Sequence, residues 1–247
     1  QRIEAAFSAN VDKLSWMDAE TRARALKKLD TLANKIGYPD VWRDYAGLGL
    51  EKGNYFANET AASVFEFKRV MDKVGKPVDR KEWGMTPPAV NAYYNPLNNE
   101  MVFPAGILQA PFFRYDFPAP MNFGGIGLVM GHELTHGYDD QGRKFDPSGR
   151  LTEWWAPGAA EKFETQATCV ADLYSSFEVQ PGVHLNGTLT LGENIADFGG
   201  VKAAYQAWTS WEADHGKAAD GVEGLSPDQL FFVAFAQSWC DKITPEY

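Results

Sequence analysis

The chain has 247 residues, of which 45% are apolar and 14% aromatic, and its formal net charge is −10. So many apolar and aromatic residues exclude a disordered chain, and the acidic balance argues against nucleic acid as a partner. No apolar run approaches the ~20 residues that a membrane-spanning helix needs, so we expect no membrane segment within these residues.

Helical signals dominate the start of the chain, and a β-hairpin is expected in its middle. Apolar residues at helical spacing predict helices over residues 18–36 and 57–74. Aromatic and β-branched residues at 90–94 and 101–103 flank a stretch rich in turn formers, which predicts the hairpin. Residues 104–123 read as a loop because prolines and glycines recur along them.

The second half of the chain predicts four more helices, over residues 124–137, 157–176, 191–208 and from Ser226 onward. Ser226 has the character of a helix cap, and Pro227 and Gln229 suit the first turn that follows it. The predicted fold class is therefore α+β, mostly helical with one small sheet.

The helix over residues 124–137 carries the pattern His-Glu-x-x-His at His132, Glu133 and His136. Two histidines four residues apart share one helical face, so both imidazoles can bind the same metal ion. Glu133 lies about 100° around the helix axis, where it can reach a metal-bound water more easily than the metal. Two histidines at this spacing by accident are the alternative, but a buried apolar helix must satisfy such polar groups, and a metal does so.

A catalytic zinc needs a third protein ligand, and the sequence offers several acids. Solvent-facing positions explain three of them equally well: Glu153, Glu161 and Glu164. Glu193 is the better candidate because Asp197 follows it at i+4 on the same face, where it can orient a ligand histidine. Gly199 and Gly200 then allow another backbone to approach closely.

Five motifs occur in order along the chain: VNAYY at 90–94, VFPAGIL at 102–108, GHELTHG at 131–137, GENIAD at 192–197 and FAQSWC at 235–240. In these motifs the sequence resembles the neprilysin and endothelin-converting-enzyme family of zinc endopeptidases. The resemblance runs from the first predicted helix to the last residue.

The resemblance implies a thermolysin-like zinc metallopeptidase domain that holds one Zn²⁺ ion. It implies His132, His136 and Glu193 as zinc ligands, Glu133 as the general base and Asp197 as the acid that orients a ligand histidine. It further implies that Asn91 and Ala92 bind the substrate backbone. By position, an apolar specificity pocket is implied at Ile107, Phe112 and Trp239, and also at Leu128 and Val129, for which ordinary core is an equally good interpretation.

The resemblance also suggests how the chain relates to longer proteins. We interpret residues 1–50 as a helical lead-in segment and residues 51–247 as the catalytic domain, truncated at its C-terminus. Family members continue past the position of Tyr247 into a segment with a further His and Arg, and a large helical region precedes the position of Gln1. These missing parts of the parent chain are expected partners, and the parent is expected to face outside the cytoplasm. In vertebrate members the counterparts of Cys169 and Cys240 pair with cysteines in those parts, so we expect free thiols here.

The predicted function is zinc-dependent endopeptidase activity on oligopeptides, with cleavage on the amino side of apolar residues and Glu-assisted attack of zinc-bound water. A zinc-holding but catalytically impaired peptide-binding fragment is the alternative. A helical domain without metal is a third interpretation, and His184 and His215 are expected at the surface with no ligand role.

Overall fold

The computed structural model describes residues 1–216 and 222–242, which form two compact units. Unit 1 comprises residues 1–37 together with the part of the chain from residue 85 onward, and unit 2 comprises residues 38–84. The domain boundary predicted at residue 50 lies inside unit 2, and the division into a lead-in segment and a catalytic domain stays a prediction.

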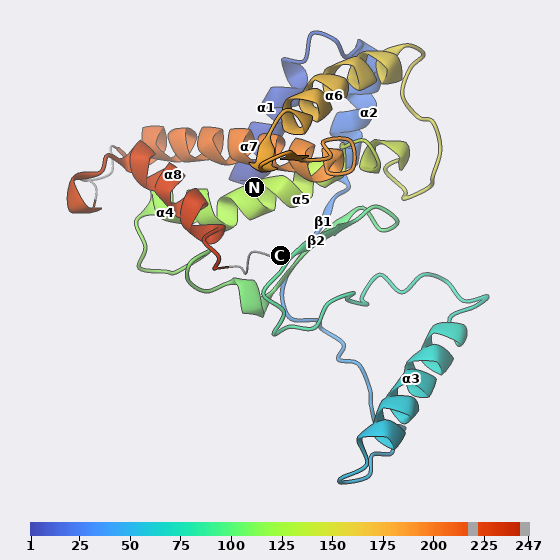
Figure 1. Cartoon of the computed structure of the whole chain (residues 1–247). Coiled ribbons are helices and arrows are strands. Elements are labelled where there is room, and N and C mark those ends of the chain that lie inside the picture. The colour runs from blue at the N-terminus through green and yellow to red at the C-terminus, as the bar shows by residue number, and fades with distance from the viewer. Residues whose placement is uncertain (217–221, 243–247) are drawn as a thin grey trace. The chain divides into compact units, whose positions relative to one another are not determined.

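Unit 1 is mostly helical, as predicted, with a small sheet beside the helices (Figure 1). Its helices are α1 (Arg2–Asp12), α2 (Ala19–Asp30), α4 (Ala119–Asn122), α5 (Leu128–His136), α6 (Ala159–Ser175), α7 (Leu191–His215) and α8 (Pro227–Ser238). A π-helical turn at Phe123–Gly127 leads into α5, and 3₁₀ turns occur at Ala105–Ile107, Gly142–Lys144 and Val222–Gly224.

The strands of unit 1 form a three-stranded sheet in the order β1-β3-β2. The predicted hairpin is confirmed as β2 (Tyr93–Asn95) and β3 (Glu100–Pro104), which pair antiparallel with Tyr93 opposite Val102. A separate two-stranded ribbon is made by β4 (Glu178–Gln180) and β5 (Val183–His184).

Strand β1 (Ala33–Gly37) corrects the helix predicted over residues 18–36, because α2 ends at Asp30. β1 pairs parallel with β3, and Ala33 lies opposite Glu100. The Lys35 ammonium reaches the buried Glu100 carboxylate at 2.7 Å, which fixes this register. A non-local strand partner therefore outweighs the helical spacing of the apolar residues.

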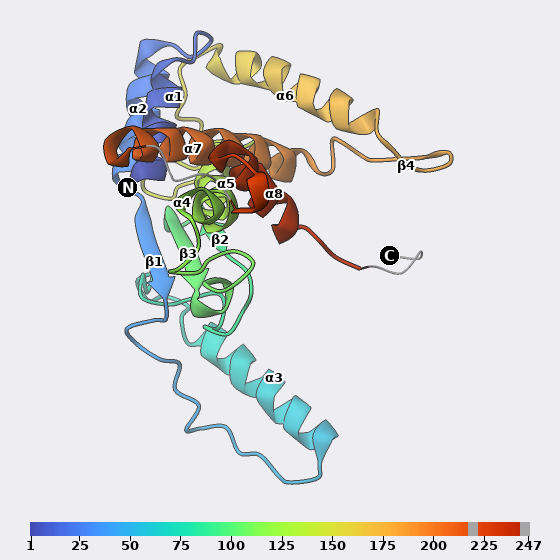
Figure 2. The same ribbon diagram turned by 90° about the vertical axis from the view of Figure 1, so that its left-hand side faces the viewer.

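Helix α7 lies next to α5 in both views of the ribbon, and the two helices form the main packing contact of unit 1 (Figure 1, Figure 2). α1 packs on α7, while α5 also contacts β2 and β3, so α5 lies between α7 and the hairpin. The predicted capping box at Ser226 is present at the start of α8, where Ser226 and Gln229 each bond the other's backbone. The core between these elements includes Phe103, Leu128, Leu134, Trp208 and Phe231.

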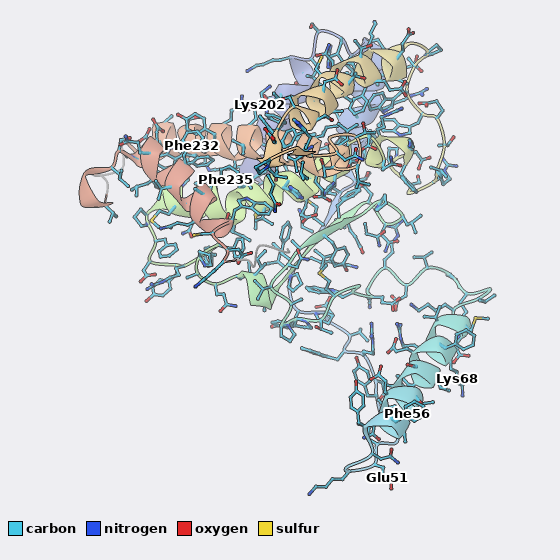
Figure 3. The ribbon with its side chains drawn as sticks, in the orientation of Figure 1. Glu51, Phe56, Lys68, Lys202, Phe232 and Phe235 are labelled. Atoms are coloured by element: carbon cyan, nitrogen blue, oxygen red, sulfur yellow. The ribbon has the colours of Figure 1, made fainter. Side chains whose placement is uncertain are left out.

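Unit 2 contains α3 (Tyr55–Met71), which confirms the second predicted helix. No residue of α3 is buried, and Phe56 is 81% exposed (Figure 3). An ion pair between Arg69 of α3 and Glu82 joins the helix to the residues that follow it in this unit. Within the described part of the chain, none of the helices combines the length and the apolar character that crossing a bilayer requires.

Candidate metal centre

Helix α5 brings His132 and His136 to one face, as the spacing predicts, and both side chains are mostly buried. Their Nε2 atoms lie 2.9 Å apart. At this distance the two nitrogens can share a proton or bind a common cation. This histidine pair provides two of the donor atoms of the candidate site.

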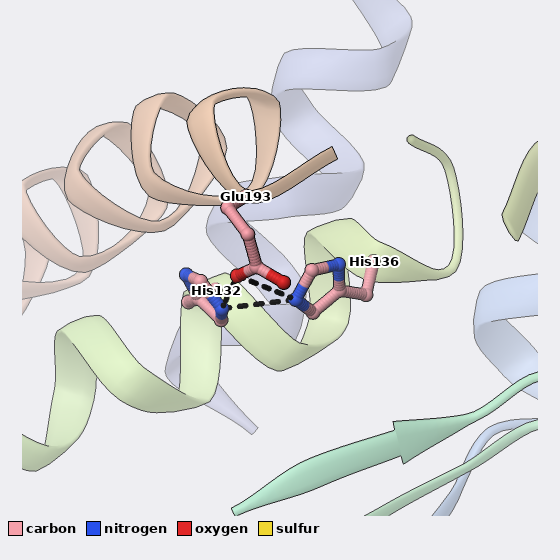
Figure 4. Close-up of side chains that lie close together, drawn as sticks. All are labelled: His132, His136 and Glu193. Carbon is pink, nitrogen blue, oxygen red and sulfur yellow. Dashed lines mark hydrogen bonds and ion pairs between the residues drawn. The ribbon is translucent and has the colours of Figure 1, made fainter. Parts of the chain in front are cut away.

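Helix α7 supplies the third donor, Glu193, which follows His136 by almost sixty residues in the sequence. Glu193 Oε2 lies 3.3 Å from His132 Nε2 and 3.5 Å from His136 Nε2 (Figure 4). The Glu193 side chain is 69% exposed, so one side of the group faces solvent. The structure therefore selects Glu193, among the acids that the sequence left open, as the carboxylate beside the two histidines.

Glycines at the crossing of α5 and α7 make this arrangement possible. A Cβ atom on Gly131 would lie 2.8 Å from the Gly200 backbone, and one on Gly200 would lie 2.8 Å from the His132 amide nitrogen. A Cβ on Gly199 would lie 2.3 Å from the Thr135 side chain. The expectation of a close backbone is confirmed at Gly200, whereas Gly199 makes room for the Thr135 side chain, and this close approach explains how Glu193 reaches the histidines.

Each histidine is held from behind by a different carboxylate. His132 Nδ1 lies 2.8 Å from Asp197 Oδ1, and His136 Nδ1 lies 2.7 Å from Asp139 Oδ2. A proton on each Nδ1 that is donated to its carboxylate leaves the Nε2 lone pair directed at the other ligand atoms. Both rings thus present a metal-binding nitrogen toward Glu193.

The donor set suits a zinc ion, in both chemistry and spacing. Zinc is bound by imidazole nitrogen and carboxylate oxygen, and ligand bonds of ~2.0–2.2 Å in a tetrahedron place the donor atoms roughly 3.3–3.6 Å apart. The three observed separations of 2.9, 3.3 and 3.5 Å need only a slight opening of the histidine pair to match. These three residues could therefore hold one metal ion and leave a fourth position open toward solvent.

Glu133 is buried beside this group and is not one of the three donors. Burial raises the pKa of its carboxyl group, an effect that the two histidines and the backbone N–H of Tyr94 oppose. Burial alone would lower the pKa of His136, but the Asp139 hydrogen bond and nearby carboxylates outweigh it and raise that pKa. A bound divalent cation would counteract both rises, since it favours the carboxylate and the neutral imidazole.

A hollow of about 450 Å³ opens in front of Glu133. Its lining includes the chain from Asn91 to Tyr94 together with His132, Glu133, His136 and Glu193. β2 is an edge strand of the sheet, and Tyr93 and Tyr94 of this strand line the hollow. The geometry thus combines a metal-binding group, a buried carboxylate and a strand edge.

Comparison with known proteins identifies the family. The sequence profile of peptidase family M13 matches residues 91–247, and a second profile of the same family, for its N-terminal part, matches residues 1–39. The chain belongs to peptidase family M13.

Several M13 peptidases resemble the chain along nearly all of its length. It is 46% identical to an endothelin-converting enzyme homolog of Locusta migratoria and to human endothelin-converting enzyme 1, over 99% of this chain in both cases. It covers only 35% and 33% of those two proteins, so it spans about a third of the length of these relatives.

Solved structures agree with this assignment. The Mycobacterium tuberculosis zinc metalloprotease Zmp1, in complex with an inhibitor, matches 96% of this chain with a TM-score of 0.91 at 40% identity. PepO from Lactobacillus rhamnosis HN001 matches 99% with a TM-score of 0.86 at 32% identity. The chain covers 37% of each of these two structures.

The M13 chain places the predicted substrate residues in two different settings. Asn91 and Ala92 line the hollow, beside the metal-binding group. Ile107 is buried in the core, Phe112 packs against that core, and Trp239 is 62% exposed. None of these last three borders the hollow, so the structure does not join them to the site.

The other predicted residues lie away from the donors. Glu164 and Glu153 face the buried Arg143, at 2.8 and 3.8 Å, and Glu161 is exposed. Cys169 and Cys240 are free and exposed, and His184 and His215 are at the surface, as expected. Within the described ranges, no other trio of histidine, cysteine or acidic side chains could hold a metal.

Asp139 is the functional residue that the sequence analysis missed. It lies three residues after His136, just beyond the end of α5, so helical spacing says nothing about where its side chain points. The available signal was the polar loop that begins at this acid directly after the motif.

Proposed function

We propose that this chain is the catalytic portion of a zinc-dependent endopeptidase that hydrolyses oligopeptides. The observation that carries the proposal is the trio of His132, His136 and Glu193 with the buried Glu133 carboxylate beside it. We assign the first three residues as the ligands of a single zinc and Glu133 as the general base.

The chemistry follows from what each group can do. Bound at this trio, zinc would supply a Lewis acid that lowers the pKa of water and polarises a carbonyl. Glu133 accepts the proton of the attacking water and delivers it to the leaving amine.

The peptide is expected to bind along β2. An extended backbone can add to the exposed edge of a sheet, and Asn91 and Ala92 lie where that edge meets the hollow. We assign these two residues to the substrate backbone. Cleavage on the amino side of apolar residues stays a prediction from the resemblance, because Ile107, Phe112 and Trp239 do not border the hollow.

Replacement of Glu133 by Gln tests the proposal in a protein that includes this chain. Glu133→Gln keeps the shape of the side chain but removes the base, so zinc should remain bound while peptide hydrolysis falls by roughly 10²–10⁴. The exposed Glu153→Gln variant is the matched control and should retain activity. Zinc content is measured by elemental analysis and cleavage by mass spectrometry of the peptide products.

Unchanged turnover in Glu133→Gln would contradict the assignment. Tight peptide binding by the wild-type protein with no hydrolysis would instead support the peptide-binding alternative, which the comparisons do not favour.

A further inference from the structure

Lys28 is a buried cation outside the metal-binding trio. It belongs to α2, and only 1% of the residue is exposed. Its Nζ atom donates hydrogen bonds to the backbone carbonyl oxygens of Gly137, Gly142 and Phe145, at 2.6, 2.8 and 2.7 Å. An ammonium group has three N–H donors, so each carbonyl matches one donor.

The three carbonyls bracket the loop that contains Asp139. Within this loop, Asp139 Oδ1 accepts the backbone N–H groups of Gln141 and Gly142, at 2.8 and 2.6 Å. Its other oxygen, Oδ2, lies 2.7 Å from His136 Nδ1. Lys28 is therefore connected to His136 in three steps. It bonds the Gly142 carbonyl, the Gly142 N–H bonds Asp139, and Asp139 lies against His136.

We propose that Lys28 is a positioning residue for the metal centre, which holds Asp139 against His136 by fixing the loop from Gly137 to Phe145. The proposal rests on the metal site proposed above and extends it to a residue on α2. Lys28 is not one of the three donors and does not itself line the hollow, so the effect on the metal that we infer passes through the loop.

The surroundings of Lys28 suit the charged form of its side chain. The rings of Tyr138, Trp154 and Tyr94 lie 5.4, 5.6 and 5.8 Å from Nζ, within the range of cation–π attraction. Burial lowers the pKa of Lys28 to about 7, an effect that the carboxylates of Asp139 and Asp146 oppose. Measurements at pH 6.5, below this pKa, therefore favour the ammonium form.

Lys28 also joins the metal side of the site to the substrate side. Its own backbone carbonyl accepts a hydrogen bond from Asn99 Nδ2 at 2.8 Å, and Asn99 Oδ1 accepts one from the Tyr94 hydroxyl at 2.9 Å. Tyr94 belongs to β2, and its backbone N–H faces Glu133.

A purely structural role, in which Lys28 only satisfies the loop carbonyls, would stabilise the fold without changing metal affinity.

The zinc dissociation constant at pH 6.5 separates these two roles. Lys28→Met keeps the length of the side chain but removes the donors, and we expect zinc to bind roughly 10–100-fold more weakly, as when a ligand's supporting partner is lost. Arg22→Met is the matched control. Arg22 is a cation on the same helix that bonds the carbonyls of Leu14 and Met17, away from the metal loop. Its loss should leave zinc affinity unchanged.

A double-mutant cycle tests the path through Asp139. Asp139→Asn should itself weaken zinc binding, and adding Lys28→Met should cause little further loss if both residues act through one contact. Full additivity of the two effects, or wild-type affinity in a folded Lys28→Met protein, would overturn the inference. A wild-type protein that bound no zinc would instead overturn the proposed metal site itself.

A measurement on the wild-type protein covers the case in which Lys28→Met does not fold. Coupling between two sites is reciprocal, so zinc binding must in turn stabilise the bonds that Lys28 makes. Hydrogen exchange of the Lys28 ammonium protons, followed by ¹⁵N NMR, should slow when zinc is added. Equal exchange rates with and without zinc would overturn the proposal.

Discussion

At the scale of single residues, the site depends on carboxylates that do not touch the metal position. Asp197 and Asp139 each lie within hydrogen-bond distance of the Nδ1 atom of one histidine, where a carboxylate favours the tautomer that carries its proton on Nδ1. The first comes from α7 and the second from the loop after α5, so the two rings are held independently. Loss of either support should weaken metal binding while the three donors remain in place.

Asp197→Asn tests this support on the His132 side. The amide keeps the size of the side chain but loses the charge that holds the Nδ1 proton, so we expect zinc affinity to fall roughly 10–100-fold. Competition with a chromophoric chelator measures the dissociation constant. Asp214→Asn, at the exposed end of the same helix, is the control and should bind zinc as the wild-type protein does. Equal affinities of the Asp197 and Asp214 variants would contradict the role of Asp197.

Spacing, together with the histidine motif and the family resemblance, identified the site residues that lie on helices. His132 and His136, and likewise Glu193 and Asp197, are pairs at i and i+4, and the structure brings all four together. The sequence pattern does not predict the roles of Asp139 and Lys28, for different physical reasons. Asp139 is placed by a loop conformation, and Lys28 is a charged residue that the helical pattern would leave in solvent, although three carbonyls and three rings enclose it.

At the scale of elements, the site is the product of one helix crossing. α5 carries both histidines and the base, α7 carries Glu193 and Asp197, and the glycines between them set the distance of closest approach. The sequence predicts both helices and, through Glu193 and the glycines, their close approach, but not how they cross, because periodicity shows which face is apolar and not which partner it meets. For the same reason β1 was predicted as helix, since its partner β3 lies more than sixty residues away.

Gly200→Ala tests the crossing. The added Cβ would lie 2.8 Å from the His132 amide nitrogen and 3.0 Å from the Leu128 carbonyl oxygen. The helices must separate to admit it, which should cost about 1–3 kcal/mol of unfolding free energy and weaken zinc binding. Urea denaturation and the chelator competition measure the two effects. Gly49→Ala, where a Cβ would meet no atom within 4 Å, is the control; equal behaviour of the two variants would contradict a tight crossing.

At the scale of the whole molecule, all residues assigned to the site belong to unit 1. The proposed ligands come from α5 and α7, which are distant in sequence. A bound metal ion would therefore connect two helices that do not follow one another along the chain. Unit 2 supplies none of these residues, and α3 buries none of its own. The chain spans about a third of its curated relatives, and the activity of the complete protein is a proposal from this portion.

Metal removal should therefore lower the stability of unit 1. A ligand that binds only the folded state adds about 2.7 kcal/mol at a free concentration of 100 times its dissociation constant. Addition of EDTA should lower the thermal midpoint, and restored zinc should raise it again. Hydrogen exchange followed by mass spectrometry should show slower exchange with zinc in α5 and α7 and no change in α3. Protection confined to α3 would place the metal elsewhere.

The ligand assignment is the central claim, and X-ray absorption at the zinc edge tests it in the wild-type protein with one equivalent of zinc. We predict a first shell of nitrogen and oxygen at about 2.0–2.2 Å, with the outer-shell scattering of two imidazole rings and no sulfur. A sulfur shell near ~2.3 Å would point to Cys169 or Cys240 instead and would contradict binding at His132, His136 and Glu193.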